Sequence, residues 1–202
     1  MKLFYAPGAC SLSPHIALCE AGLDFELAKV DLGAKTVEDG SSFDSVNAKG
    51  YVPTLQLDNG EYLTEGPAIV QYIADQKPDS GLAPAAGTLE RYRLQEWLTF
   101  LNSELHKNFS PLFNPGSSDD MKAAASAALD QRLTYIAHQL EGKDFILGSD
   151  FTVADGYLFT ILGWGQFVGI DIGKWPTLAA YAGRIAQRPA VQKAMQAEGL
   201  LG

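Results

Sequence analysis

A change of hydrophobic pattern near residue 80 constrains the fold of this 202-residue chain more than any other feature. Before it, short runs alternate between the two-residue period of strands and the 3.6-residue period of helices, and after it only helical stripes occur. Between the two parts lies "KPDSGLAPAAG", a segment rich in proline and glycine. We therefore expect two domains, residues 1–77 and 88–202, joined by a linker over residues 78–87.

The first part reads as strand, helix, strand, and then as a hairpin followed by a helix. Strands are predicted at Lys2–Tyr5 and Phe25–Asp31, with a helix at Ser13–Ala21 between them. The turn Asp58-Asn59-Gly60 lies between alternating runs, which is a strong hairpin signal. A further helix opens at Gly66-Pro67 and runs to about Gln76. The order is thus βαβ and then ββα.

The second part predicts only helices, so the fold class is α+β, with a mixed domain followed by an all-α domain. A leucine stripe indicates a helix over residues 88–109, and another follows over residues 119–140. Thr152 to Asp155 has the form of a capping box with an acidic third residue. The segment after it is apolar on all sides, which is typical of a buried central helix. Two shorter helices follow, the last after Arg188-Pro189.

Charge and composition exclude several classes of function. The formal net charge of −9 argues against a duplex-binding surface, so no nucleic-acid partner is expected. Two cysteines and three scattered histidines make neither a disulfide framework nor a readable metal site. The most apolar stretch, residues 156–170, is too short and too rich in glycine to span a membrane. No secretory signal is recognised at the start of the chain, and we expect a cytoplasmic protein.

Cys10 is the first candidate for chemistry, because it lies between a glycine-containing turn and the predicted start of a helix. Backbone N–H groups and the helix dipole at such a position stabilise a thiolate. Cys10-Ser11-Leu12-Ser13 also has the form C-x-x-S, a one-thiol version of a redox pair. The alternative is a buried small residue, which on the cysteine alone has about equal weight. For Cys19, in the middle of the helix, the packing interpretation is favoured.

Two further motifs flank the predicted hairpin. In "GYVPTL", Val52-Pro53 precedes the hairpin, and Val52 could pair its backbone with a peptide-like ligand. Only about 5% of X–Pro bonds are cis, so sequence alone does not assign a cis bond here. In "TEGPAI", Glu65 precedes a helix start that could bind an amino-acid end, with its carboxylate at the N–H groups and its ammonium at Glu65. The alternative is that Glu65 only caps the helix.

These residues together resemble a known family. Strand, turn, cysteine, helix and hairpin in this order resemble the thioredoxin fold, in which a cis proline faces the active cysteine. The whole chain resembles the glutathione S-transferases, specifically the bacterial beta class. The resemblance rests on "KLFYAPGACSLSPHIAL", "KGYVPTL", "LTEGPAIVQYIAD", the pair His106-Lys107, "FTVADGYLF" and "RPAVQKAMQAEGL", which occur in this order and spacing.

The resemblance implies a glutathione site with Cys10 and His106 as its catalytic residues. Cys10 would face the glutathione sulfur, Val52 would pair with its cysteinyl residue, and Glu65 would hold its γ-glutamyl end. The expected glutathione-binding residues are Cys10, Lys35, Tyr51, Val52, Pro53, Glu65, Gly66, Ser103, His106 and Lys107. The family also implies a homodimer, because the neighbouring subunit supplies a residue near positions 99–104. Glutathione is the implied co-substrate, and no metal is expected.

The implied reaction is conjugation of the glutathione thiolate to an apolar electrophile, in detoxification or catabolism. The electrophile is expected in a cleft between the domains, lined by Phe113, Tyr157 and Trp164. One alternative is thiol–disulfide chemistry through a mixed disulfide on Cys10. Tyr5, on the first strand, is a further candidate for holding the thiolate. Another alternative is a non-catalytic ligand-binding or partner-binding module.

Overall fold

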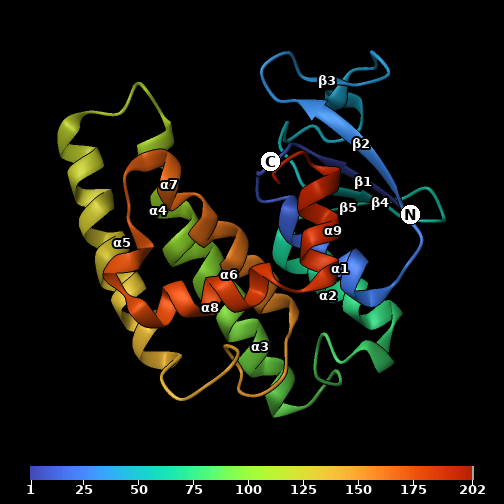
Figure 1. Cartoon of the computed structure of the whole chain (residues 1–202). Coiled ribbons are helices and arrows are strands. Elements are labelled where there is room, and N and C mark those ends of the chain that lie inside the picture. The colour runs from blue at the N-terminus through green and yellow to red at the C-terminus, as the bar shows by residue number, and fades with distance from the viewer. Residues whose placement is uncertain (202) are drawn as a thin grey trace. The chain divides into compact units, whose positions relative to one another are not determined.

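A computed structural model describes residues 1–201 and groups them into two compact units. The first unit consists of residues 1–83 together with the C-terminal segment from Gln187, and the second is Pro84–Ala186. The sequence predicted that the C-terminal segment belongs to the helical domain instead. The difference arises from α9 (Pro189–Ala197), which packs against α1 (Leu12–Ala21) and buries Val191 and Ala194 (Figure 1).

The first unit contains one five-stranded sheet with the order β3-β2-β1-β4-β5. Its strands are β1 (Lys2–Tyr5), β2 (Glu26–Asp31), β3 (Thr36–Val37), β4 (Thr54–Gln56) and β5 (Tyr62–Thr64). β1 and β2 are parallel and joined through α1, whereas β4 is antiparallel to β1 and to β5. The predicted βαβ and ββα order is confirmed, and so is the thioredoxin-like class of the first domain.

The sequence pattern predicted the helices of this unit but not its shortest strand. β3 has only two residues and was not predicted, because two residues carry no readable period. The helix α1 ends as predicted at Gly22, which adopts a left-handed conformation with φ of 62°. The unit also contains α2 (Gly66–Gln76) and two 3₁₀ turns, Phe43–Ser45 and Pro78–Ser80.

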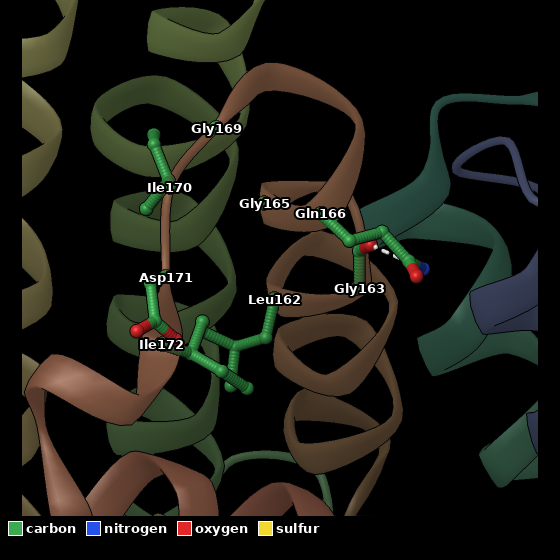
Figure 2. A pocket seen from close by; sticks show the side chains of 8 residues that line it. All are labelled: Leu162, Gly163, Gly165, Gln166, Gly169, Ile170, Asp171 and Ile172. Carbon is green, nitrogen blue, oxygen red and sulfur yellow. Dashed lines mark hydrogen bonds between the residues drawn. The ribbon is translucent and has the colours of Figure 1, made fainter.

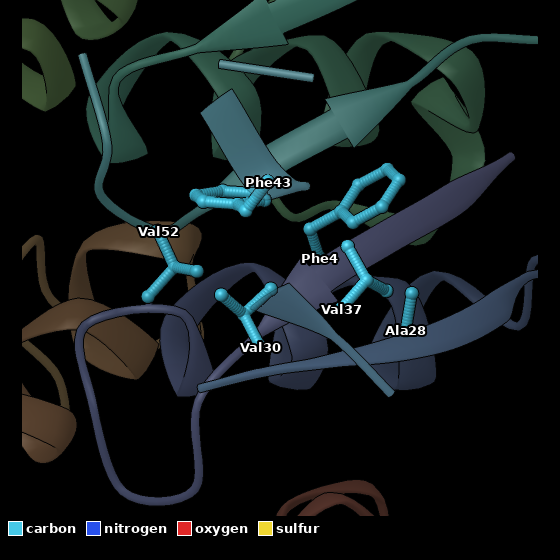
Figure 3. Close-up of a cluster of buried hydrophobic side chains, with 6 residues drawn as sticks. All are labelled: Phe4, Ala28, Val30, Val37, Phe43 and Val52. Atoms are coloured by element: carbon cyan, nitrogen blue, oxygen red, sulfur yellow. The ribbon is translucent and has the colours of Figure 1, made fainter. Parts of the chain in front are cut away.

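A cluster of buried apolar side chains lies against one part of the sheet and fixes the segment before β4. Figure 3 shows its members, which are Phe4, Ala28, Val30, Val37, Phe43 and Val52. Val52 is only 4% exposed, and burial of a valine side chain stabilises the fold by about 1.5–3 kcal/mol. Because this side chain is held in the core, the position of the Val52 backbone is set by packing.

The secondary structure of the second unit is helical, apart from loops and one isolated bridge between Phe145 and Gly148. Its elements are α3 (Leu89–Phe100), a π-helical turn (Leu101–His106), α4 (Lys107–Phe113), α5 (Asp119–Gln139), α6 (Val153–Gly163), α7 (Gly165–Val168), a 3₁₀ turn (Ile172–Lys174) and α8 (Pro176–Ala186). α4 packs against α5 (Figure 1). Of the helices formed by residues 1–201, none is both long enough and apolar enough to cross a membrane.

The first long helix differs from the prediction in one respect. The sequence predicted a continuous helix over residues 88–109, but the structure has a π turn from Leu101 to His106 between α3 and α4. π turns are rare and occur frequently at functional sites. Their hydrogen bonds join residues five apart, so a pattern search at 3.6 residues does not reveal them.

Asp155 anchors the start of the buried helix α6, as the capping-box motif predicted. Its carboxylate accepts hydrogen bonds from the backbone N–H and the hydroxyl of Thr152 at 2.8 and 2.9 Å. It also accepts hydrogen bonds from the Ile146 N–H and the Tyr181 hydroxyl, both at 2.8 Å. Burial raises the pKa of Asp155, and these hydrogen bonds oppose the rise. The carboxylate of the capping box therefore also binds two groups outside the motif, on Ile146 and Tyr181.

Candidate active site

The loop that carries Cys10 is held at both ends by buried polar groups. The Ser11 hydroxyl donates to the Ala6 carbonyl and accepts from the Ala6 N–H, each at 3.1 Å. From the C-terminal segment, one carboxylate oxygen of Glu198 accepts from the Gly8 N–H at 2.9 Å, and the other lies 2.8 Å from Nδ1 of His15. The side chains of Glu198 and His15 are 0% and 2% exposed. Cys10 is therefore presented by a constrained loop.

The Cys10 thiol lies against the backbone of Val52. Its sulfur donates to the Val52 carbonyl oxygen at 3.2 Å, and the Val52–Pro53 peptide bond is cis. A carbonyl oxygen only accepts, so the thiol in this contact carries its proton. The structure thus brings together the cysteine and the Val-Pro motif, as the sequence predicted.

The start of α1 corrects one sequence expectation about Cys10. We expected unpaired N–H groups of the first helical turn to stabilise a thiolate at this sulfur. Instead, the Leu12 N–H donates to the Ala9 carbonyl at 3.0 Å and the Ser13 N–H to the Cys10 carbonyl at 3.2 Å. The tight turn before the helix supplies these carbonyls and uses the two donors. The thiol is therefore arranged as a hydrogen-bond donor.

Glu65 is strained and paired at the start of α2. Its φ of 72° is unusual for a residue with a Cβ, and such outliers persist where the surrounding structure enforces them, frequently at ligand sites. The same Glu65 oxygen accepts from Lys49 Nζ at 2.7 Å and from the Tyr51 hydroxyl at 2.8 Å. A Cβ built on Gly66 would lie 4.0 Å from the ring of Pro53, so this corner adjoins the cis proline.

Lys35 contacts the loop that precedes the cis proline. Lys35 has a φ of 58°, and its ammonium group donates to the Gly50 carbonyl. The buried Asn47 side chain holds this loop by donating to the Tyr51 carbonyl at 2.8 Å and to the Thr54 hydroxyl at 3.0 Å. The predicted residues Cys10, Lys35, Tyr51, Val52, Pro53, Glu65 and Gly66 therefore lie along one connected set of contacts in the first unit.

In the second unit, His106 lies at the end of the π turn, and its ring makes one hydrogen bond within residues 1–201. Its Nδ1 lies 2.7 Å from the Tyr157 oxygen, and the Tyr157 hydroxyl donates to Oδ1 of Asn102 at 3.0 Å. Burial, with a smaller contribution from the Lys107 charge, lowers the pKa of His106 from 6.5 to about 4. His106 is therefore neutral at physiological pH.

Aromatic rings surround His106. The ring centre of Trp164 lies 4.7 Å from that of His106 and 6.2 Å from that of Phe113. Phe109, which the sequence analysis missed, lies 5.6 Å from Trp164. Phe113 is 48% exposed, whereas Trp164 and Tyr157 are 7% and 2% exposed. The three predicted electrophile-pocket residues thus belong to one cluster, with Phe113 as its exposed edge.

Comparison with known proteins identifies the family of the chain. Residues 8–76 match the family model "Glutathione S-transferase, N-terminal domain", and residues 100–189 match "Glutathione S-transferase, C-terminal domain". The chain belongs to the glutathione S-transferase family. It is 47% identical to glutathione S-transferase GstA of Escherichia coli O157:H7, over 99% of this chain and 100% of that protein.

Solved structures confirm the class. The bacterial beta-class glutathione S-transferase of Sphingomonas chungbukensis is 59% identical, with a TM-score of 0.97 and full coverage of both chains. A sphingomonad glutathione S-transferase complexed with glutathione is 57% identical, with a TM-score of 0.96, covering 99% of this chain and 100% of the other. The predicted bacterial beta class is therefore confirmed for this glutathione S-transferase.

Two of the predicted glutathione-binding residues of this transferase lie beside His106 on the helix surface. The Ser103 hydroxyl donates to the Thr99 carbonyl one turn earlier, at 3.0 Å. Lys107 is exposed at the first position of α4. The glutathione contacts of Ser103, His106 and Lys107 remain predictions.

A separate cavity of about 490 Å³ lies where α6 gives way to α7 and the following loop. Figure 2 shows its lining, which comes from residues 162–172 and includes Leu162, Ile170 and Ile172. None of the three predicted electrophile-pocket residues lines it. The electrophile-binding role of the cluster around Trp164 therefore stays a prediction.

The rival groups for thiolate binding are poorly suited to that role. Tyr5 is 8% exposed, and burial, followed by the charges of Glu198 and Glu38, raises its pKa. The Ser11 hydroxyl is already bonded to Ala6, as described above. Ser13, the serine of the C-x-x-S motif, is buried, and its hydroxyl has no hydrogen-bond partner among residues 1–201. Cys10, whose sulfur lies at the Val52 backbone, remains the candidate for binding the glutathione thiolate.

Several residues of this arrangement were not found from the sequence. Lys49 was not predicted as a site residue, yet its ammonium group pairs with Glu65. Glu198 and His15 are far apart in the chain, and no short motif joins them. Phe109 could have been found, because it lies three and four residues from His106 and Phe113 on one helix.

Proposed function

We propose that this glutathione S-transferase binds glutathione on its first unit, stabilises the glutathione thiolate and conjugates it to apolar electrophiles. The observation that carries the proposal is the contact of the Cys10 thiol with the Val52 carbonyl, beside the cis Pro53. The sphingomonad relative, 57% identical, is a complex with glutathione, which supports the same ligand here. Neither the redox alternative nor the non-catalytic alternative gains support from the relatives.

Glutathione fits the charges and donors of the first unit. Its cysteinyl N–H would pair with the Val52 carbonyl as in an added strand, and the Cys10 thiol would then turn its proton toward the glutathione sulfur. The γ-glutamyl end carries an ammonium and a carboxylate. Glu65 and Lys49, whose charged groups lie 2.7 Å apart, present the two complementary charges. Gly66 adds a backbone N–H at the start of α2.

A hydrogen bond from Cys10 to the thiolate accounts for part of the catalysis. A thiol with a pKa near 8.5 is only about 3% ionised at pH 7. Lowering that pKa by about two units corresponds to about 2.7 kcal/mol, and the gain in thiolate is limited to about thirtyfold because ionisation saturates. The remaining acceleration comes from holding the thiolate next to the electrophile. Trp164 and Phe113 form the apolar surface for that electrophile.

We also propose that the transferase acts as a cytoplasmic homodimer. Leu89 and Tyr92 on α3 are 65% and 59% exposed, which leaves apolar side chains on the helix that precedes the π turn. A second copy would bury them and contribute a residue near positions 99–104 to the site. Light scattering during gel filtration measures the mass directly, and a monomer mass near 21.7 kDa would refute the dimer.

The test compares conjugation of glutathione to 1-chloro-2,4-dinitrobenzene by three cysteine variants at saturating glutathione. Cys10→Ala removes the donor, Cys10→Ser keeps a donor in place of the thiol, and Cys19→Ala is the matched control in the middle of α1. We expect Cys10→Ala to lose at least tenfold in rate, Cys10→Ser to retain more, and Cys19→Ala to equal the wild type. Thermal stabilisation by glutathione provides a separate measure of binding.

The outcomes separate the parts of the proposal. Full activity in Cys10→Ala would show that another group manages the thiolate. Binding of glutathione without conjugation of any electrophile would refute the transferase step and keep the ligand. Absence of thermal stabilisation by glutathione at millimolar concentration would refute the binding site itself.

A further inference from the structure

The hydrogens of the Asn102–Tyr157–His106 chain can be assigned from its geometry. The amide oxygen of Asn102 is an acceptor only, and the Tyr157 hydroxyl donates its single hydrogen to it at 3.0 Å. Toward His106, the Tyr157 oxygen can then only accept. The nitrogen at 2.7 Å, Nδ1 of His106, must therefore carry the hydrogen of that contact.

A neutral imidazole carries one hydrogen on its two nitrogens, so this assignment determines the other nitrogen as well. With Nδ1 protonated, Nε2 has a lone pair and is an acceptor. Nε2 has no hydrogen-bond partner among residues 1–201, whereas Nδ1 is used by Tyr157. Histidine tautomers are commonly set in this way, by the hydrogen bond that the other nitrogen makes.

Packing opposes a flip of the His106 ring that would exchange the positions of its two nitrogens. The Tyr157 ring is 2% exposed within α6, and its ring centre lies 6.0 Å from that of His106 at an angle of 76°. Trp164 packs on His106 with ring centres 4.7 Å apart. The π turn contributes Asn102 and His106 from one stretch of helix to the same phenol. The three groups therefore form a fixed chain rather than a transient contact.

We propose that Asn102 and Tyr157 are positioning residues that hold His106 as its Nδ1–H tautomer, so that Nε2 serves the transfer reaction as a proton acceptor and not as a donor. This inference rests on the proposed function and names the part His106 takes in it. At Nε2, the glutathione S–H bond breaks, its electron pair stays on sulfur, and the hydrogen forms the second N–H of the imidazolium. Nδ1–H continues to donate to Tyr157 throughout, so no ring rotation is needed.

The assignment also excludes the opposite role. A neutral His106 in this tautomer cannot donate a hydrogen bond from Nε2 to a thiolate. Stabilisation of the thiolate must then come from other donors, such as the Cys10 thiol. Tyr157 is accordingly a support for His106 through its hydroxyl, in addition to any contact of its ring with the electrophile.

Two kinds of measurement on the full-length protein test the proposal. Long-range ¹H–¹⁵N correlation spectra of the histidine rings distinguish the two neutral tautomers without any substrate. The variants are Tyr157→Phe and Asn102→Leu, which break the chain, and Asn102→Asp, which keeps an acceptor for the Tyr157 hydroxyl. Tyr135→Phe, at an exposed tyrosine on α5, is the matched control for loss of a phenol group.

We expect the Nδ1–H pattern for His106 in the wild type, in Asn102→Asp and in Tyr135→Phe. In Tyr157→Phe and Asn102→Leu we expect a mixture of tautomers and about a tenfold lower turnover of 1-chloro-2,4-dinitrobenzene at saturating glutathione, with the KM for glutathione within twofold. An Nε2–H pattern in the wild type would overturn the assignment even if conjugation is normal. A wild type that shows the Nδ1–H pattern but conjugates nothing would support the assignment and overturn the proposed function. Unchanged turnover in Tyr157→Phe would overturn the positioning role.

Discussion

Replacing Glu198 by alanine is expected to destabilise the first unit strongly, although residue 198 lies close to the end of the chain. The Glu198 carboxylate accepts from the Gly8 N–H at 2.9 Å and lies 2.8 Å from Nδ1 of His15. Both the Glu198 and His15 side chains are almost completely buried. Alanine would remove the carboxylate that both groups share, in a place where the His15 side chain is shielded from water.

The magnitude follows from the cost of unsatisfied buried groups. A buried donor that loses its partner costs about 1–3 kcal/mol, and here the buried His15 side chain and the partly buried Gly8 N–H share one carboxylate. We therefore expect a loss of about 2–4 kcal/mol in the free energy of unfolding. For a chain of this size, 1 kcal/mol corresponds to about 2–4 °C in Tm, so a fall of about 4–16 °C is expected.

Urea denaturation of matched variants checks this prediction. Glu198→Gln keeps the shape and one acceptor, and we expect about half of the loss. Glu141→Ala removes the same kind of contact, 2.9 Å from His138, at a site where both side chains are more than 60% exposed. That control should change stability by less than about 0.5 kcal/mol. A loss in Glu198→Ala no larger than in Glu141→Ala would refute the reasoning.

Two other predictions concern the second unit. Asp155→Ala should lower the free energy of unfolding by at least about 2 kcal/mol in urea denaturation, because it leaves the N–H groups of Ile146 and Thr152 without their acceptor. Asp150→Ala, at an exposed position, should be neutral, and similar losses in both variants would contradict this. The pKa of His106 falls from 6.5 in the unfolded chain to about 4 in the native protein, so the unfolded state binds more protons between these values and stability decreases as the pH falls through them. At pH 5.5, which is above the isoelectric point near 4.7, the free energy of unfolding of the wild type should be about 1.4 kcal/mol lower than at pH 8. His106→Gln should not show this decrease. Equal decreases in both proteins would show that the histidine is not neutral.

Part of the candidate site consists of short motifs that can be recognised in the sequence, and part consists of contacts between distant residues that cannot. The Val-Pro motif, the cysteine before a helix and the glutamate before a glycine were recognised because each is a few residues long. The resemblance to a family then supplied their roles. The partners of Glu65 were visible only in the structure, because Lys49 and Tyr51 lie 16 and 14 residues from it. Val52 lies 42 residues from Cys10, and only the resemblance to the thioredoxin fold indicated that the two lie together.

The sequence by itself determined the order of the strands and helices apart from β3, the C-terminal end of α1, the start of α6 and the α+β class. Periodicity, glycine at a left-handed position and a capping box act within a few residues, so they can be read along the chain. Only the tertiary structure decided that the C-terminal segment joins the first unit, that Glu198 reaches Gly8 across 190 residues, and that Nδ1 of His106, at the end of a π turn, lies 2.7 Å from the Tyr157 oxygen. These features depend on which distant donors and acceptors packing brings within about 3 Å, and no local pattern encodes that choice.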